Sequence, residues 1–149
     1  MKKVILFSSL LFLIACNTNK VQLPEKQSVL DTLVKVNEYL MKKWPDPAAT
    51  VTTNRERSSN LWTRGTYYEG LMALYSVYPQ DQFYQYAVEW GEGHNWQFRT
   101  DSDPHTPQIY TTNANHLCAA QTYIDLYEID PKSERIKYVK LCIDSTLRT

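Results

Sequence analysis

The stretch LYSVYP, Leu74–Pro79, returns as LYEIDP, Leu126–Pro131, at an offset of 52 residues. Each copy ends an apolar helical pattern at a proline, and a second helical pattern follows directly. The correspondence continues along that second helix, where it pairs Tyr86 with Tyr138, Ala87 with Val139 and Trp90 with Cys142. The chain therefore contains two copies of a unit made of a helix, a proline-marked turn and a helix.

Apolar residues at helical spacing predict five helices, over residues 28–44, 67–78, 81–91, 114–129 and 132–147. Ser28 is the predicted N-cap of the first helix, with Asp31 in the place of a capping-box acid. The first helix is expected to turn one apolar face inward, made of Val29, Leu33, Val36, Leu40 and Trp44; the third is expected to bury Phe83, Tyr86, Ala87 and Trp90. No convincing strand is found, although residues 97–100 and 108–111 could extend briefly.

Helical hairpins that repeat in this way stack side by side, because a single hairpin cannot cover its own apolar face. The stack either stays open as a solenoid or closes into an α/α toroid. The long loop over residues 92–112 favours the toroid, in which such loops gather at one end. A ring of six hairpins at this period needs about 300 residues, so we expect residues 28–149 to be the amino-terminal part of a longer all-α domain.

The segment over residues 1–27 is not expected to belong to the fold. Lys2 and Lys3 precede the apolar run Val4–Ala15, which suits a secretory signal and is too short to span a bilayer. The sequence Leu-Ile-Ala before Cys16 is similar to the lipobox of bacterial lipoproteins. We therefore expect a signal peptide over residues 1–15, a lipid on Cys16 and a tether over residues 16–27. The protein would then be exported and held on a bacterial membrane, facing the periplasm or the cell surface. The alternative is an ordinary signal peptide with a coincidental cysteine.

The composition bears on partners and cofactors. The formal net charge is zero, which argues against nucleic acid as a partner. The 11 tyrosines and 4 tryptophans, against only 4 glycines, favour helices packed around an aromatic-lined groove. His94, His105 and His116 are evenly spaced along the chain and lack metal-ligand spacing, so no metal is expected.

Three segments carry a resemblance to a known family: WTRGTYYEGLMALY, Trp62–Tyr75; WGEGHNWQFR, Trp90–Arg99; and NANHLCAAQTYIDLY, Asn113–Tyr127. The chain from about Leu30 onward resembles glycosyl hydrolase family 88 and its relative family 105, the unsaturated glucuronyl and rhamnogalacturonyl hydrolases. The resemblance implies helical hairpins of an (α/α)6 barrel, incomplete in this chain. It also implies an oligosaccharide substrate with a terminal 4,5-unsaturated uronic acid, left by lyases acting on pectin, rhamnogalacturonan or glycosaminoglycans.

The chemistry implied by the resemblance is hydration of an enol ether rather than attack on the glycosidic carbon. An aspartic acid protonates C4, water adds at C5, and the hemiketal opens without any cofactor. In the family the main catalytic aspartate lies further along than residue 149, and a second carboxylate corresponds to Asn115 here. An amide cannot exchange a proton usefully near neutral pH. We therefore expect a truncated fragment whose own activity is in question.

The resemblance also suggests substrate contacts, which are Trp62, Arg64, Tyr67, Trp96, His116 and Gln121. Each has a structural alternative. Asn115 and His116 could simply cap a helix, Arg64 could be solvated at a helix start, and the aromatic residues could be core. His94 is a further candidate donor. Asp101 or Asp103 is the only local substitute acid, although a solvated turn around them is favoured.

Two further alternatives stay open. Cys118 and Cys142 are equally far along the sequence from Asp130, so an antiparallel hairpin places them at similar height. Core packing of the two thiols is favoured over a disulfide.

The second alternative concerns function: the chain is a lipid-anchored helical module that binds glycans or a protein without catalysis.

Overall fold

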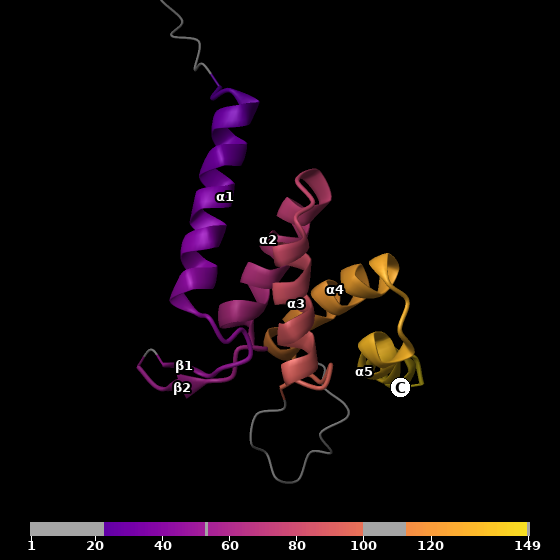
Figure 1. Cartoon of the computed structure of the whole chain (residues 1–149). Helices are drawn as coiled ribbons and strands as arrows, with labels where there is room; N and C mark the ends of the chain where they lie inside the picture. Colours follow the sequence, from indigo (N-terminus) through magenta and orange to yellow (C-terminus); the bar gives the residue numbers. More distant parts are fainter. Residues whose placement is uncertain (1–22, 53, 100–112, 149) are drawn as a thin grey trace, which may run out of the picture.

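A computed structural model describes residues 23–52, 54–99 and 113–148 of the chain (Figure 1). The described part is mostly helical, with one short β-hairpin beside the helices. In chain order the elements are α1 (Lys26–Lys43), β1 (Val51–Thr52), β2 (Glu56–Arg57), α2 (Trp62–Val77), α3 (Asp81–Gly93), α4 (Ala114–Ile129) and α5 (Ser133–Leu147). The predicted all-α class and all five predicted helices are confirmed. Within the described part, no helix is both long and apolar enough to cross a membrane.

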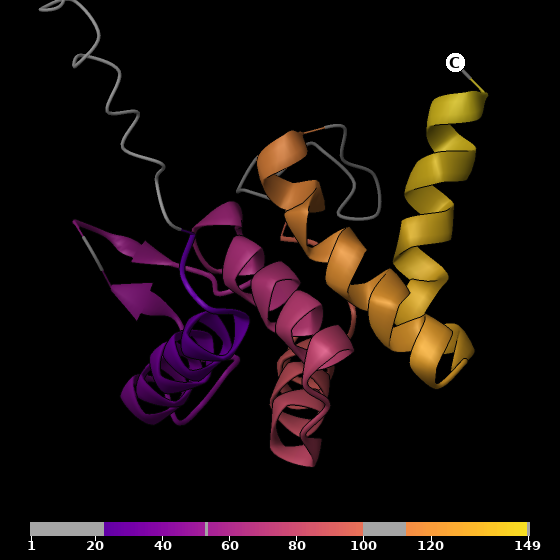
Figure 2. The ribbon, with the colours of Figure 1, turned by 90° about the horizontal axis from the view of Figure 1, so that it is seen from above.

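The helices form one leading helix and two hairpins, α2–α3 and α4–α5. Helices α2 and α4 lie side by side with their first turns toward the same side of the molecule (Figure 2). Each of them is followed by a helix that runs back along it, α3 after α2 and α5 after α4. This is the arrangement predicted from the repeat of helix, proline-marked turn and helix.

Tyrosines at equivalent positions of the two hairpins each hydrogen-bond to the segment that precedes their own hairpin. The Tyr86 hydroxyl donates to the carbonyl oxygen of Trp44 at 2.6 Å, and the Tyr138 hydroxyl accepts from Nε2 of Gln97 at 3.0 Å. The first bond ties α3 to the end of α1, and the second ties α5 to the segment after α3. Trp44 and Trp96, which are separated by the same offset as the tyrosines, each lie under an arginine guanidinium. The repeat therefore extends back to the end of α1.

The core is built from the facing sides of α2, α3 and α4. Tyr68 stacks on Trp90 with ring centroids 4.0 Å apart, and Trp90 also contacts Tyr123. The four residues predicted to face inward from the third helix are all buried, which confirms that prediction. Burying large aromatic surfaces in this way is the main stabilising contribution available to a helical hairpin pair.

Helix α1 differs from its prediction in both its start and its buried face. It begins at Lys26 after Glu25, and Ser28 lies inside the first turn, where its carbonyl accepts from Thr32. Val29, Leu33 and Val36 are 41–51 % exposed. The residues that pack inward are Leu30, Val34, Asn37 and Met41. The apolar arc of α1 is wider than the surface that α2 covers, and the spacing alone does not say which part of the arc makes the contact.

The bounds of the other helices agree closely with those predicted, except at the start of α2, and the β-hairpin was not predicted. Helix α2 begins at Trp62 instead of residue 67, because Gly65 is a helical residue packed against α4. The segment predicted as loop before α2 contains the antiparallel pair β1–β2, in which Val51 faces Arg57. No strand forms over residues 97–99 of the described chain; residues 100 and 108–111 lie outside it.

Both predicted core cysteines are free thiols, Cys142 buried and Cys118 half-buried, so the prediction of packing without a disulfide is confirmed. The expected signal peptide, the lipid site at Cys16 and the candidate acids Asp101 and Asp103 all lie outside the described residues.

Candidate functional site

The first turns of α2 and α4 meet at Gly65. A methyl group placed on Gly65 would lie 3.1 Å from Cβ of Cys118, one turn into α4. The absence of a side chain at Gly65 therefore lets the two helices approach closely. Because the helices run the same way, their amino-terminal ends form one edge of the molecule (Figure 2). The backbone N–H groups at helix amino termini carry a partial positive charge and favour anionic groups such as sugar carboxylates.

The start of α4 is capped by Asn113 and not by Asn115. Oδ1 of Asn113 accepts from the backbone N–H of Asn115 at 2.9 Å, and its carbonyl accepts from the N–H groups of His116 and Leu117. The Asn115 side chain is exposed in the first turn, and the His116 side chain is buried. Capping by Asn113 leaves the Asn115 amide available for a ligand.

The start of α2 presents Trp62 to solvent. Trp62 is 47 % exposed, and its carbonyl accepts from the Thr66 hydroxyl within the helix. Leu61 is buried and is the N-cap, without a side-chain cap bond. An exposed indole at a helix start is a suitable platform for a sugar face.

Arg64 is in the interior. It is 3 % exposed, its guanidinium lies 4.4 Å from the Trp44 ring, and Nη2 donates to the Tyr68 and Tyr86 hydroxyls at 2.8 and 3.3 Å. Those hydroxyls in turn donate to the carbonyls of Pro47 and Trp44. Burial therefore favours a structural role for Arg64, which fixes the segment between α1 and β1 onto the hairpin α2–α3.

Tyr67 and Trp96 are also held by structural contacts. The half-buried Tyr67 donates to Oδ1 of Asn37 on α1 at 2.7 Å, and burial raises the pKa of its hydroxyl far above the usual range. Trp96 is buried with a left-handed backbone (φ 57°), its ring edge-on to Tyr123 and beneath the Arg135 guanidinium. The buried Trp96 ring therefore presents no free face to a sugar, and the Tyr67 hydroxyl is already paired with Asn37.

His94 makes a buried contact with Ser59 that joins two distant segments. The Ser59 hydroxyl lies 2.7 Å from Nε2 of His94, and Nδ2 of Asn60 donates to the carbonyl of Gln97 at 2.9 Å. Burial lowers the pKa of His94 to about 4, against a smaller opposing effect of Asp46. The imidazole is therefore neutral near pH 7, and its bond holds the segment that leads into Trp62.

A groove of about 510 Å³ runs between α2 and α4, further from the helix starts. Its polar lining includes Glu69, Gln121 and Asp125, and Nε2 of Gln121 donates to Oδ1 of Asp125 at 2.8 Å. The remaining lining residues are Met72, Ala73, Tyr75, Ser76, Glu128 and Ile129. Carboxylates and an amide along an open groove can accept hydrogen bonds from sugar hydroxyls.

Comparison with known proteins identifies the family of this chain. The family model for Glycosyl Hydrolase Family 88 matches residues 32–149. The chain belongs to glycosyl hydrolase family 88. A solved structure, glycosyl hydrolase family 88 from Bacteroides vulgatus, superposes with a TM-score of 0.61 at 17 % sequence identity. The match covers 84 % of this chain and 35 % of that one, and at this identity it demonstrates the fold. No curated protein matches the sequence significantly.

For this family 88 chain, the structure divides the predicted contact residues into two groups. Trp62, Asn115 and Gln121 are exposed on α2 and α4. The others lie behind them, namely Arg64, Tyr67, Trp96 and His116. The groove carboxylates Glu69 and Asp125 were not predicted. They could have been found from helical spacing, since Glu69 shares a face with Trp62 and Asp125 lies one turn beyond Gln121.

Proposed function

We propose that this family 88 chain forms the part of a glycosidase that receives an oligosaccharide ending in a 4,5-unsaturated uronic acid. Membership of the family supports glycosidase chemistry in general. The observation that carries the finer proposal is the placement of exposed Trp62 and exposed Asn115 on adjacent helix starts. An aromatic face, an amide and two helix amino termini together suit a planar, anionic sugar ring.

The proposed reaction is hydration of the enol ether. It needs a carboxylic acid that protonates C4 and a base that directs water to C5. Asn115 hydrogen-bonds the sugar but transfers no proton, because an amide does not titrate near neutral pH. Since the chain spans 35 % of the solved family member, we assign the catalytic acid to the part of the barrel that it does not span.

The amide at position 115 favours a second candidate function. In that alternative the chain is a helical module that binds glycans or a protein partner without turnover. Such a module needs the same exposed tryptophan and amide but no acid. It would bind saturated and unsaturated sugar ends alike, because no step depends on the double bond.

We also propose that the protein is exported and anchored by a lipid on Cys16. The support is the sequence of residues 1–16: two lysines, an apolar run and Leu-Ile-Ala before the cysteine. Metabolic labelling with a radioactive fatty acid in a bacterial host tests it. Label incorporated by the natural chain and lost in Cys16→Ser supports the anchor, whereas equal label in both contradicts it.

The glycan proposal is tested by binding and turnover with an unsaturated uronyl disaccharide. We expect saturable binding, which Trp62→Ala reduces at least tenfold with an unchanged melting temperature. Tyr39→Ala, which removes an exposed aromatic side chain on α1, is the control and should leave binding unchanged. Loss of the enol-ether absorbance reports turnover, which we do not expect from this chain alone. Equal affinity for the saturated disaccharide would support the noncatalytic module, and no binding would refute both.

A further inference from the structure

The segment that follows α3, residues 94–98, contacts three other parts of the fold, and we call it the clasp. Its direction is set by Asn95 and Trp96, two successive residues with a left-handed backbone (φ 51° and 57°). This backbone is unfavourable for residues that carry a side chain, so it persists only where surrounding contacts hold it. Here it turns the chain at the end of α3 and brings Gln97 between the start of α2 and helix α4.

The carbonyl oxygen of Gln97 joins the two sides of the candidate site. It accepts from Nδ2 of Asn60 at 2.9 Å and from the hydroxyl of Tyr123 at 3.2 Å, which occupies both of its lone pairs. Asn60 lies two residues before Trp62, and Tyr123 lies about two helical turns after Asn115 on α4. One oxygen atom therefore connects the segment that leads to the indole with the helix that carries the amide.

The start of α2 depends on the clasp, because its N-cap residue makes no capping bond. That residue is Leu61, which has no polar side chain. The two residues before it are buried, Ser59 at 0 % and Asn60 at 4 % exposed, and both contact the clasp. The Ser59 hydroxyl lies 2.7 Å from Nε2 of His94. These bonds take the place of a cap and fix the backbone from which Trp62 projects.

The clasp is also held by α4 and α5. The rings of Trp96 and Phe98 are buried, and their centroids lie 5.4 and 6.1 Å from that of Tyr123 on α4. Nε2 of Gln97 donates to the hydroxyl of Tyr138 on α5 at 3.0 Å. Ring packing and hydrogen bonds thus fix the clasp to the second hairpin, so the start of α2 keeps a fixed position relative to α4.

We propose that the clasp sets the spacing between Trp62 and Asn115, and that Asn60 and Gln97 are positioning residues for sugar binding. The inference rests on the proposed function, in which these two exposed residues contact the sugar. A displacement of about 1 Å in such a site is enough to weaken the recognition of a substrate. Neither positioning residue contacts the sugar itself, because Asn60 is buried and Gln97 acts through its main-chain carbonyl.

Asn60→Ala removes the bond between the start of α2 and the clasp, and Asn37→Ala is the matched control. Asn37 is equally buried, at 4 % exposed, and its side chain also bonds to another helix, through the Tyr67 hydroxyl. Both variants should lower the melting temperature by similar amounts. Asn60→Ala alone should weaken binding of the unsaturated uronyl disaccharide at least fivefold. It alone should also lower the NMR order parameter of the Trp62 backbone N–H from about 0.85 to below about 0.6.

Tyr123→Phe is the second variant, because it keeps the ring and loses only the hydroxyl. Tyr86→Phe is its control, since the Tyr86 hydroxyl also donates to a main-chain carbonyl, that of Trp44. We expect Tyr123→Phe to weaken binding about threefold and to shift the backbone amide resonance of Trp62, whereas Tyr86→Phe changes neither. If Asn60→Ala does not fold, this pair decides, and equal effects of the two variants would overturn the proposal.

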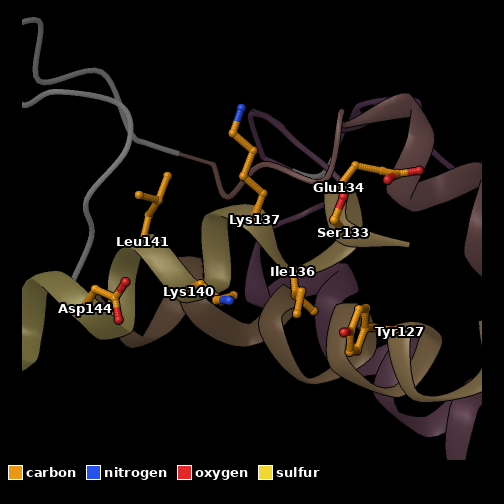
Figure 3. A pocket seen from close by; sticks show the side chains of 8 residues that line it. All are labelled: Tyr127, Ser133, Glu134, Ile136, Lys137, Lys140, Leu141 and Asp144. Atoms are coloured by element: carbon orange, nitrogen blue, oxygen red, sulfur yellow. The ribbon is translucent and has the colours of Figure 1, made fainter. Parts of the chain in front are cut away.

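An open groove on α4 and α5 provides a surface control. Its volume is about 510 Å³, and its lining is Tyr127, Ser133, Glu134, Ile136, Lys137, Lys140, Leu141 and Asp144 (Figure 3). The residues that hold the clasp lie outside this lining. Lys140→Ala should therefore change neither the affinity for the disaccharide nor the order parameter of Trp62. Weaker binding in Lys140→Ala would place the sugar in this groove and overturn the proposal.

Two further results would each overturn it. The first is an equal loss of affinity in Asn60→Ala and Asn37→Ala, and the second is an unchanged order parameter of Trp62 in Asn60→Ala. The order parameter is measured without sugar. If the natural chain bound no disaccharide, the proposed function would fail, and the order parameter would still decide whether the clasp positions Trp62.

Discussion

Replacing Gly91 by alanine tests whether Trp96 is a structural wedge or a sugar platform. A Cβ on Gly91 would lie 2.3 Å from Cζ3 of Trp96, and 2.7 Å from both Cε3 and Cη2. Carbon atoms in contact are normally about 3.5–4.0 Å apart. The ring cannot swing aside easily, because it is buried against Tyr123 and follows the left-handed residue Asn95. Gly91→Ala should therefore expel the indole or unwind the end of α3.

The expected magnitude follows from two opposing effects. Alanine in a helix is more favourable than glycine by about 1 kcal/mol, and losing a buried tryptophan costs about 3–5 kcal/mol. The net loss of about 3 kcal/mol corresponds to a fall in melting temperature of roughly 10 °C. Gly70→Ala is the control, since nothing lies within 4 Å of its Cβ, and it should stabilise the chain by about 1 kcal/mol.

Urea unfolding followed by circular dichroism measures both variants. If Gly91→Ala were as stable as the natural chain, the indole would have to be free to move. The argument that Trp96 is unavailable to a sugar because it is wedged against α3 would then be refuted.

Three further predictions concern buried polar groups. His94 takes up a proton near pH 6.5 in the unfolded chain but only near pH 4 in the folded chain. Lowering the pH from 6.5 to 4 should therefore reduce the free energy of unfolding by about 2 kcal/mol, after allowing for partial exposure. A His94→Gln variant whose free energy of unfolding, measured in urea, changes equally with pH would contradict this. The free energy of unfolding of Arg64→Met should stay within about 1 kcal/mol of the natural chain, whereas Arg64→Ala should lose about 3 kcal/mol. Methionine keeps the packing on Trp44 and removes a buried cation that has no carboxylate partner among the described residues. Equal losses of both variants in denaturant unfolding would contradict this. Thiol titration of unfolded, unreduced Cys16→Ser protein should find two free thiols, at Cys118 and Cys142, and a count of none would show a disulfide.

The repeat and the prolines were sufficient to predict the hairpins. The bounds predicted for α4, residues 114–129, are those observed, although its cap is Asn113 and the sequence had suggested Asn115 and His116 as capping residues. Helix α2 was predicted to start too late, at Tyr67 instead of Trp62, because Gly65 resembles a helix breaker. The helical role of Gly65 depends on the close approach of Cys118 from the second hairpin, and no local pattern contains that information.

The late start predicted for α2 also explains why contact residues on this helix were misplaced. With Arg64 expected before the helix, its side chain was free to face a ligand. Inside the helix, Arg64 shares a face with Tyr68 and Leu71, and that face is buried. Trp62 and Thr66 lie on the opposite face of α2, which is exposed to solvent. Trp96 could not have been placed from sequence, since its burial depends on a left-handed turn after α3.

The central claim is that the amino-terminal edge formed by α2 and α4 receives the unsaturated uronyl end. An NMR titration of the ¹⁵N-labelled chain with an unsaturated uronyl disaccharide tests it most directly, beside the saturated disaccharide. We predict that the unsaturated sugar shifts the Trp62 indole and the Asn115 side-chain amide, and leaves the buried Trp96 indole unchanged. Shifts confined to other surfaces, or no shifts from a folded chain, would contradict the claim.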